Sequence, residues 1–122
     1  MAKRRIGTAE GVAAVRSALA GDEARSTVAT AVRYLLEELA AVAPGATVEM
    51  RVPPFGATQC VAGPRHTRGT PPNVIETDPQ TWIALATGGL GWGDALASGR
   101  VAASGSRADL AGLLPLLRLP AA

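Results

Sequence analysis

Cys60 and His66 are the residues whose types suggest nucleophilic chemistry, because a neighbouring imidazole can convert a thiol to the reactive thiolate. The two lie six positions apart, Cys60 on an expected strand and His66 in the loop after it. This spacing permits contact without requiring it, and only Glu76 or Asp78 could orient the imidazole. The alternative is a small buried hydrophobic residue followed by a loop histidine. We expect this second arrangement, and therefore no catalytic residue.

Ligands for a metal or a cofactor are also too few. One cysteine and one histidine supply two ligands, whereas a zinc site needs about three or four. The glycines at 88, 89 and 91 follow an expected helix instead of a strand, so they do not form a dinucleotide fingerprint, and the TRGTPP stretch lacks the phosphate-loop pattern. We expect neither a metal nor a cofactor.

The composition favours one small domain. The chain has 122 residues, a net charge of +2 and a single cysteine, which excludes an internal disulfide. Its clustered basic residues, Lys3 to Arg5, lie at the terminus, so no nucleic-acid partner is expected. No apolar stretch fits a signal peptide or a membrane span. We predict a disordered basic N-terminus (1–7), a single domain (8–122) and a cytoplasmic location.

Apolar periodicity and turn residues predict the elements that must position any site. Helices are expected at 8–20, from Val28 to Val42, at 78–88 with Asp78 as N-cap, at 92–98 and at 107–117 with a kink at Pro115. Strands are expected at 47–52 and 57–62, which form a hairpin, and at 73–77 and 101–104. The fold class is therefore α+β, a small, largely antiparallel sheet of four to five strands covered on one side by helices.

The C-terminal half resembles the sterol carrier protein (SCP-2-like) family, in particular its short bacterial members. The matching parts, in order, are Asn73–Thr77, Asp78–Gly88, Trp92–Ser98, Gly99–Gly105 and Arg107–Leu117. The segment GPRHTRGTPPNVIETDP also looks like that subgroup, and the resemblance spans Val48 to Leu117. The family's strand ahead of its long helix has no clear counterpart here.

The resemblance implies a non-catalytic carrier with a hydrophobic cavity between the sheet and the C-terminal helices. The implied ligand is apolar, such as a fatty acyl chain, a phospholipid or an isoprenoid-like molecule, and transient membrane contact is compatible with this role. The residues expected to line the cavity are Met50, Val52, Phe55, Trp82, Leu85, Trp92, Leu96, Val101, Leu110, Leu113, Leu114 and Leu117. Ordinary core packing is the alternative for all of them.

A cluster of basic residues is the candidate for holding an anionic headgroup. It consists of Arg51, Arg65, His66 and Arg68. The alternative is that these charges only solvate a loop and a strand face. Two other functions stay open at this point: an interaction or accessory module of the same fold with a filled cavity, and an enzyme that depends on Cys60.

Overall fold

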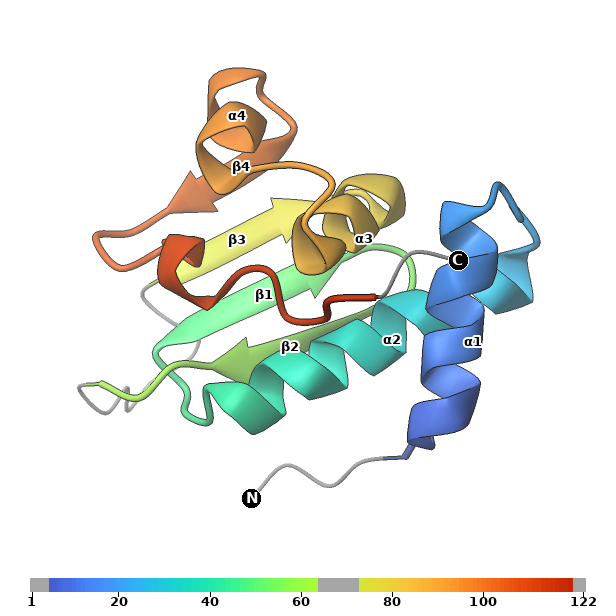
Figure 1. Cartoon of the computed structure of the whole chain (residues 1–122). Helices are drawn as coiled ribbons and strands as arrows, with labels where there is room; N and C mark the ends of the chain where they lie inside the picture. The colour runs from blue at the N-terminus through green and yellow to red at the C-terminus, as the bar shows by residue number, and fades with distance from the viewer. Residues whose placement is uncertain (1–4, 64–72, 120–122) are drawn as a thin grey trace.

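The computed structural model describes residues 5–63 and 73–119 (Figure 1). In chain order the elements are α1 (Thr8–Leu19), α2 (Arg25–Val42), β1 (Val48–Val52), β2 (Gly56–Cys60), β3 (Asn73–Thr77), α3 (Pro79–Thr87), α4 (Trp92–Ala97), β4 (Val101–Ser104) and a 3-10 turn (Ala111–Leu113). The predicted α+β class, the hairpin and four strands are confirmed.

The strands form one mixed sheet with the order β2-β1-β3-β4. The outer pairs are antiparallel, but β1 and β3 run parallel, so the sheet is less antiparallel than predicted. The reason is the position at which the chain re-enters the sheet after β2. Cys60 at the end of β2 and Asn73 at the start of β3 both lie opposite Val48, so β3 begins beside the start of β1 and runs with it.

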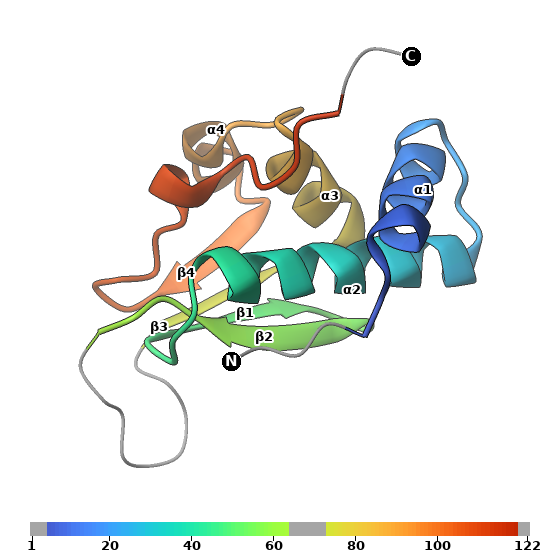
Figure 2. The ribbon, with the colours of Figure 1, turned by 60° about the horizontal axis from the view of Figure 1, so that its bottom comes forward.

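Helices cover one face of this sheet and leave the other open (Figure 2). The alternation along β1 shows this division, because Val48, Met50 and Val52 are buried while Glu49 and Arg51 are only half-buried. The apolar core therefore lies between the sheet and the helical layer.

The long helix α2 supplies much of that core, and α1 packs on it from outside. The apolar stripe of α2 begins at Val28 and is buried through Leu39. Close approach of α1 depends on Gly11, since a Cβ at that position would overlap the buried ring of Tyr34. A glycine at this helix crossing is thus required by space.

Helix α3 begins and ends as the sequence predicts. The Asp78 carboxylate accepts a hydrogen bond from the Thr81 backbone N–H at 2.8 Å, and Pro79 occupies the first helical position. The helix ends at Gly88, whose φ of 89° is the left-handed conformation that glycine adopts without strain. Asp78 therefore contributes a helix cap.

The prediction of a Leu-rich helix at 107–117 is wrong. Only Ala111–Leu113 makes a 3-10 turn, and Leu114 already has an extended backbone with ψ of 144°. Pro115 explains the difference, because its ring disfavours helical geometry at the preceding residue and it has no N–H to donate. Residues 114–119 instead form an irregular segment, here called the C-terminal strap.

Candidate functional site

Most residues predicted to line a cavity come together in the core between sheet and helices. Met50, Val52, Trp82, Leu85 and Leu110 are all at most 1% exposed. Trp92 and Val101 are also buried and belong to the same apolar cluster. The structure therefore gathers seven of the twelve predicted residues in one buried cluster.

The other five predicted residues lie elsewhere. Leu113, Leu114 and Leu117 are half-buried at the edge of this cluster, in or just before the strap. Leu96 is 42% exposed on α4, so the structure does not bring it to the core. Phe55, between β1 and β2, packs against the edge of the cluster and also lines a surface groove.

Side chains fill the space between the sheet and the helices. Trp82 is completely buried, and its indole Nε1 donates to the Val32 carbonyl oxygen at 3.3 Å. Four hollows are described on the structured part of the chain, and only the largest is lined by any of the twelve predicted residues, namely Phe55. The predicted wall is thus a packed wall in this conformation.

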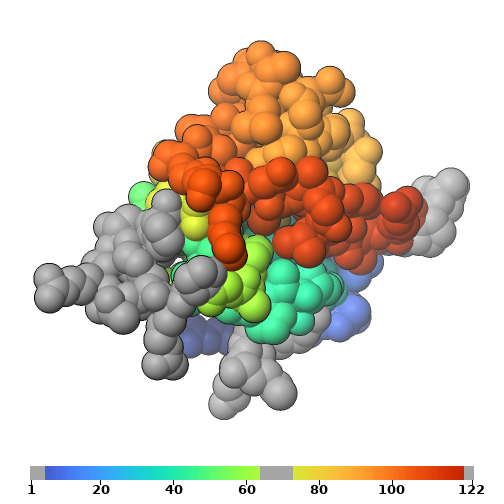
Figure 3. Space-filling model, turned by 90° about the vertical axis from the view of Figure 1, so that its left-hand side faces the viewer, coloured from blue at the N-terminus to red at the C-terminus, as the bar shows by residue number. Residues whose placement is uncertain are grey.

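The C-terminal strap lies across the open side of that core. In Figure 3 it runs between the α4–β4 region above and α2 and β2 below. Two backbone hydrogen bonds attach it to α3, from the N–H groups of Leu116 and Leu117 to the Ala86 carbonyl oxygen at 2.8 and 3.0 Å. Its leucines rest half-buried against the core. The strap is held mainly by apolar contact.

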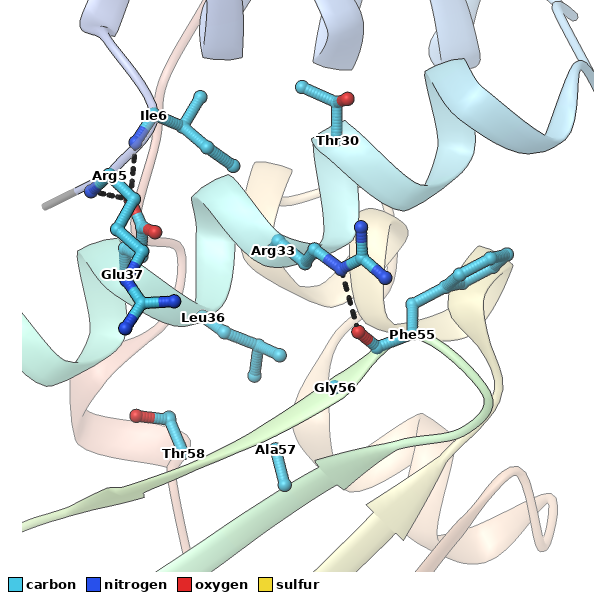
Figure 4. A pocket seen from close by; sticks show the side chains of 10 residues that line it. All are labelled: Arg5, Ile6, Thr30, Arg33, Leu36, Glu37, Phe55, Gly56, Ala57 and Thr58. Atoms are coloured by element: carbon cyan, nitrogen blue, oxygen red, sulfur yellow. Dashed lines mark hydrogen bonds between the residues drawn. The ribbon is translucent and has the colours of Figure 1, made fainter.

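The largest hollow, of about 710 Å³, is a groove between α2, the N-terminal segment and the edge strand β2 (Figure 4). We call it the basic groove. Its lining residues are Arg5, Ile6, Thr30, Arg33, Leu36, Glu37, Phe55, Gly56, Ala57 and Thr58. It borders the core, because Leu36 lines the groove and also belongs to the buried apolar cluster.

Hydrogen bonds fix the walls of the basic groove. The Arg33 Nε donates to the Phe55 carbonyl oxygen at 2.8 Å, and the Arg25 guanidinium lies 5.1 Å from the centroid of the Phe55 ring. Glu37 Oε1 accepts from the backbone N–H groups of Arg5 and Ile6 at 3.3 and 3.2 Å. The one carboxylate in the lining therefore already has two donors.

A comparison with protein families matches residues 24–116 to the model described as a bacterial SCP ortholog, where SCP denotes sterol carrier protein. The chain belongs to this bacterial SCP family. The match confirms the resemblance found in the sequence, and it begins after α1. No curated protein matches the chain.

The headgroup cluster expected in this SCP-family chain is only partly described. Arg65, His66 and Arg68 lie outside the described residues. Arg51 lies on the open face of the sheet, where its Nε pairs with the Glu49 carboxylate. Arg51 is thus on the opposite side of the sheet from the apolar core and its strap.

Cys60 behaves as a core residue of this SCP-family chain. It is completely buried, and burial raises the pKa of its thiol to about 11. At neutral pH it is therefore the unreactive thiol.

Across residues 5–63 and 73–119, no three histidine, cysteine, aspartate or glutamate side chains are grouped as a metal site. No helix in these ranges is long and apolar enough to cross a membrane.

Sequence reasoning missed the basic groove, because its walls come from three separate parts of the chain. One signal was present: Arg33 and Glu37 lie one helical turn apart and off the apolar stripe of α2. What the sequence could not provide was the position of Arg5 and of the β2 edge beside that turn.

Proposed function

We propose that this protein is a non-catalytic carrier of an apolar ligand, such as a fatty acyl chain, a phospholipid or an isoprenoid-like molecule. The observation that carries the proposal is the strap: leucines without regular secondary structure rest half-buried on an apolar core. Membership of the bacterial SCP family supports the same role. The cytoplasmic location expected from the sequence is part of the proposal.

The ligand enters, in this proposal, by taking the place of the strap. Displacing residues 114–119 breaks two hydrogen bonds to Ala86 and leaves every strand pairing of the sheet intact. The strap and the residue before it present Leu113, Leu114, Leu116, Leu117 and Leu119 to the core.

The free energy lost when the strap is displaced is comparable to the free energy gained when an acyl chain is buried in its place. A half-buried leucine contributes about 1 kcal/mol, so the four leucines of the strap hold it by about 4 kcal/mol. Each methylene of an incoming chain regains about 0.8 kcal/mol when it is buried, so about five buried methylenes offset the loss. An ordinary acyl chain is long enough for this.

A specific observation favours the interaction module as the second candidate. Trp82 and its neighbours are buried, and none of the four hollows of the described residues lies between the sheet and the helices. In that case the strap is a permanent part of the core and the protein acts through its surface.

Native mass spectrometry of the purified protein, paired with analysis of lipids in an organic extract, tests the choice. The carrier predicts a discrete added mass that corresponds to a lipid. It also predicts that an NBD-labelled stearate binds, and that Leu117→Ala speeds its association, whereas Leu19→Ala, at a residue 50% exposed on α1, does not. A bare mass together with no binding of the labelled stearate would reject the carrier in favour of the module.

A further inference from the structure

The basic groove lies beside one edge of the sheet. Within residues 5–63 and 73–119, β2 is the outer strand of the sheet, so one row of its backbone N–H and C=O groups has no partner strand there. Proteins usually guard such an edge with charged residues or proline, but β2 reads GATQC and contains neither. Gly56 and Ala57 are exposed and carry little or no side chain that would keep another strand away.

The wall opposite this edge is cationic. Arg33 uses its Nε for the Phe55 carbonyl, and Figure 4 shows its two terminal nitrogens between Thr30 and Phe55. The Arg5 side chain extends beside Leu36 toward β2 in the same view. With two arginines in the lining, and Glu37 engaged by two N–H groups, the groove favours an anionic occupant.

Apolar contacts complete the groove. Leu36 forms part of its floor, with Ile6 and Phe55 at the sides. Arg25 lies over the Phe55 ring, so a third cation contacts a residue of the lining. An occupant that alternates acidic and apolar side chains therefore matches both kinds of surface.

The other edge of the sheet lacks these features. β4 borders a hollow of about 280 Å³ lined by Val74, Glu76 and the three residues 102–104, without a cation. The combination of a free strand edge, positive charge and apolar floor is thus found at β2 and not at β4.

We propose that the basic groove is a docking site for an acidic peptide segment of a partner protein, which binds in extended form as an added strand along β2. Backbone pairing with β2 supplies affinity that does not depend on the peptide's sequence, and Arg33 and Arg5 select acidic side chains. This site is separate from the strap, so its success or failure is independent of the proposed lipid carrier role.

Panning a phage-displayed library of random heptapeptides against the whole protein tests the proposal. The expected result is enrichment of aspartate and glutamate at alternating positions, and its disappearance when Arg33→Glu protein is used. Arg16→Glu is the matched control, because Arg16 is exposed on α1, lies outside the groove lining and changes the net charge equally. Circular dichroism checks that each variant is folded, and Arg33→Gln gives an intermediate case.

A synthetic copy of an enriched peptide then tests the binding mode by fluorescence anisotropy. Arg33→Glu should lower its affinity by about tenfold or more, as for loss of an interfacial charge pair. N-methylation of alternate peptide amides should abolish binding in one register and spare it in the other, because only alternate amides face β2.

Three results would overturn the proposal. One is a library without acidic enrichment over the Arg33→Glu background. Another is a peptide that tolerates N-methylation in both registers, which excludes strand addition. The third is binding to phosphatidylglycerol vesicles without any enriched peptide, which would make the groove a membrane contact instead.

Discussion

The indole Nε1 of Trp82 donates a hydrogen bond to the carbonyl oxygen of Val32 across 3.3 Å, and so joins α3 to α2 at the centre of the core. Both residues are completely buried. A buried indole N–H needs a partner, and the helix carbonyl supplies it. This contact explains how a tryptophan expected to line a cavity can be part of a packed interior.

Trp82→Phe should therefore destabilise the protein more than the same change at Trp92. Loss of the hydrogen bond and of ring volume should lower the free energy of unfolding by about 1–3 kcal/mol. Trp92 is 9% exposed and serves as the control, with a smaller expected loss. Urea unfolding followed by circular dichroism measures both, and equal losses would contradict the role given to the Val32 contact.

Gly11→Ala should weaken the packing of α1 on α2. The added Cβ would overlap the Tyr34 ring, and relieving such an overlap costs about 1–3 kcal/mol. Gly93→Ala is the matched control in α4, because a Cβ there meets nothing within 4 Å. Thermal unfolding should show a lower melting temperature for the first variant and no decrease for the second. An unchanged Gly11→Ala protein would mean that the helices are not in close contact.

Cys60 should make stability depend on pH in the alkaline range. Burial raises its pKa from 9.0 to about 11, so the folded state retains a proton that the unfolded state has lost. The contribution is complete below pH 9.0 and is lost as the pH rises toward about 11. Urea titrations between these values should show a decline that is reduced in Cys60→Ala. Rapid alkylation of native Cys60 by iodoacetamide at neutral pH would contradict this burial.

Hydrogen exchange should distinguish the strap from the sheet. The Leu116 and Leu117 N–H groups bond to one carbonyl, that of Ala86, in a segment without regular structure. They should exchange far faster than the amides of β1, which lies between two strands. Mass spectrometry of peptides covering 113–119 makes the measurement. Protection equal to that of β1 would count against a strap that opens for ligand.

The elements that the sequence predicts well are those with local signals. Asp78 and Pro79 mark the start of α3, and the alternation of Val48, Met50 and Val52 assigns the covered face of β1. At the C-terminus the leucine spacing favours a helix, but Pro115 disfavours helical geometry at Leu114, where the backbone is extended. Local patterns thus predict helices and strands correctly where no proline interrupts the pattern.

Features that depend on distant contacts could not be predicted in the same way. The parallel pairing of β1 and β3 follows from where β2 ends, which no pattern within either strand encodes. The filled core likewise depends on how Trp82 meets α2, and the basic groove on how Arg5 meets Glu37. For the candidate site, the sequence predicted most of the buried residues but neither the packed state nor the groove.

The crossing of Gly11 over Tyr34 has a consequence for assembly. The family match begins at residue 24, after α1, and α1 packs on α2 around Tyr34. The connection between the two helices, residues 20–24, holds α1 at an effective concentration on the order of millimolar or above. The chain therefore carries its own tethered competitor for that face, and an external helix would have to outcompete it to bind there.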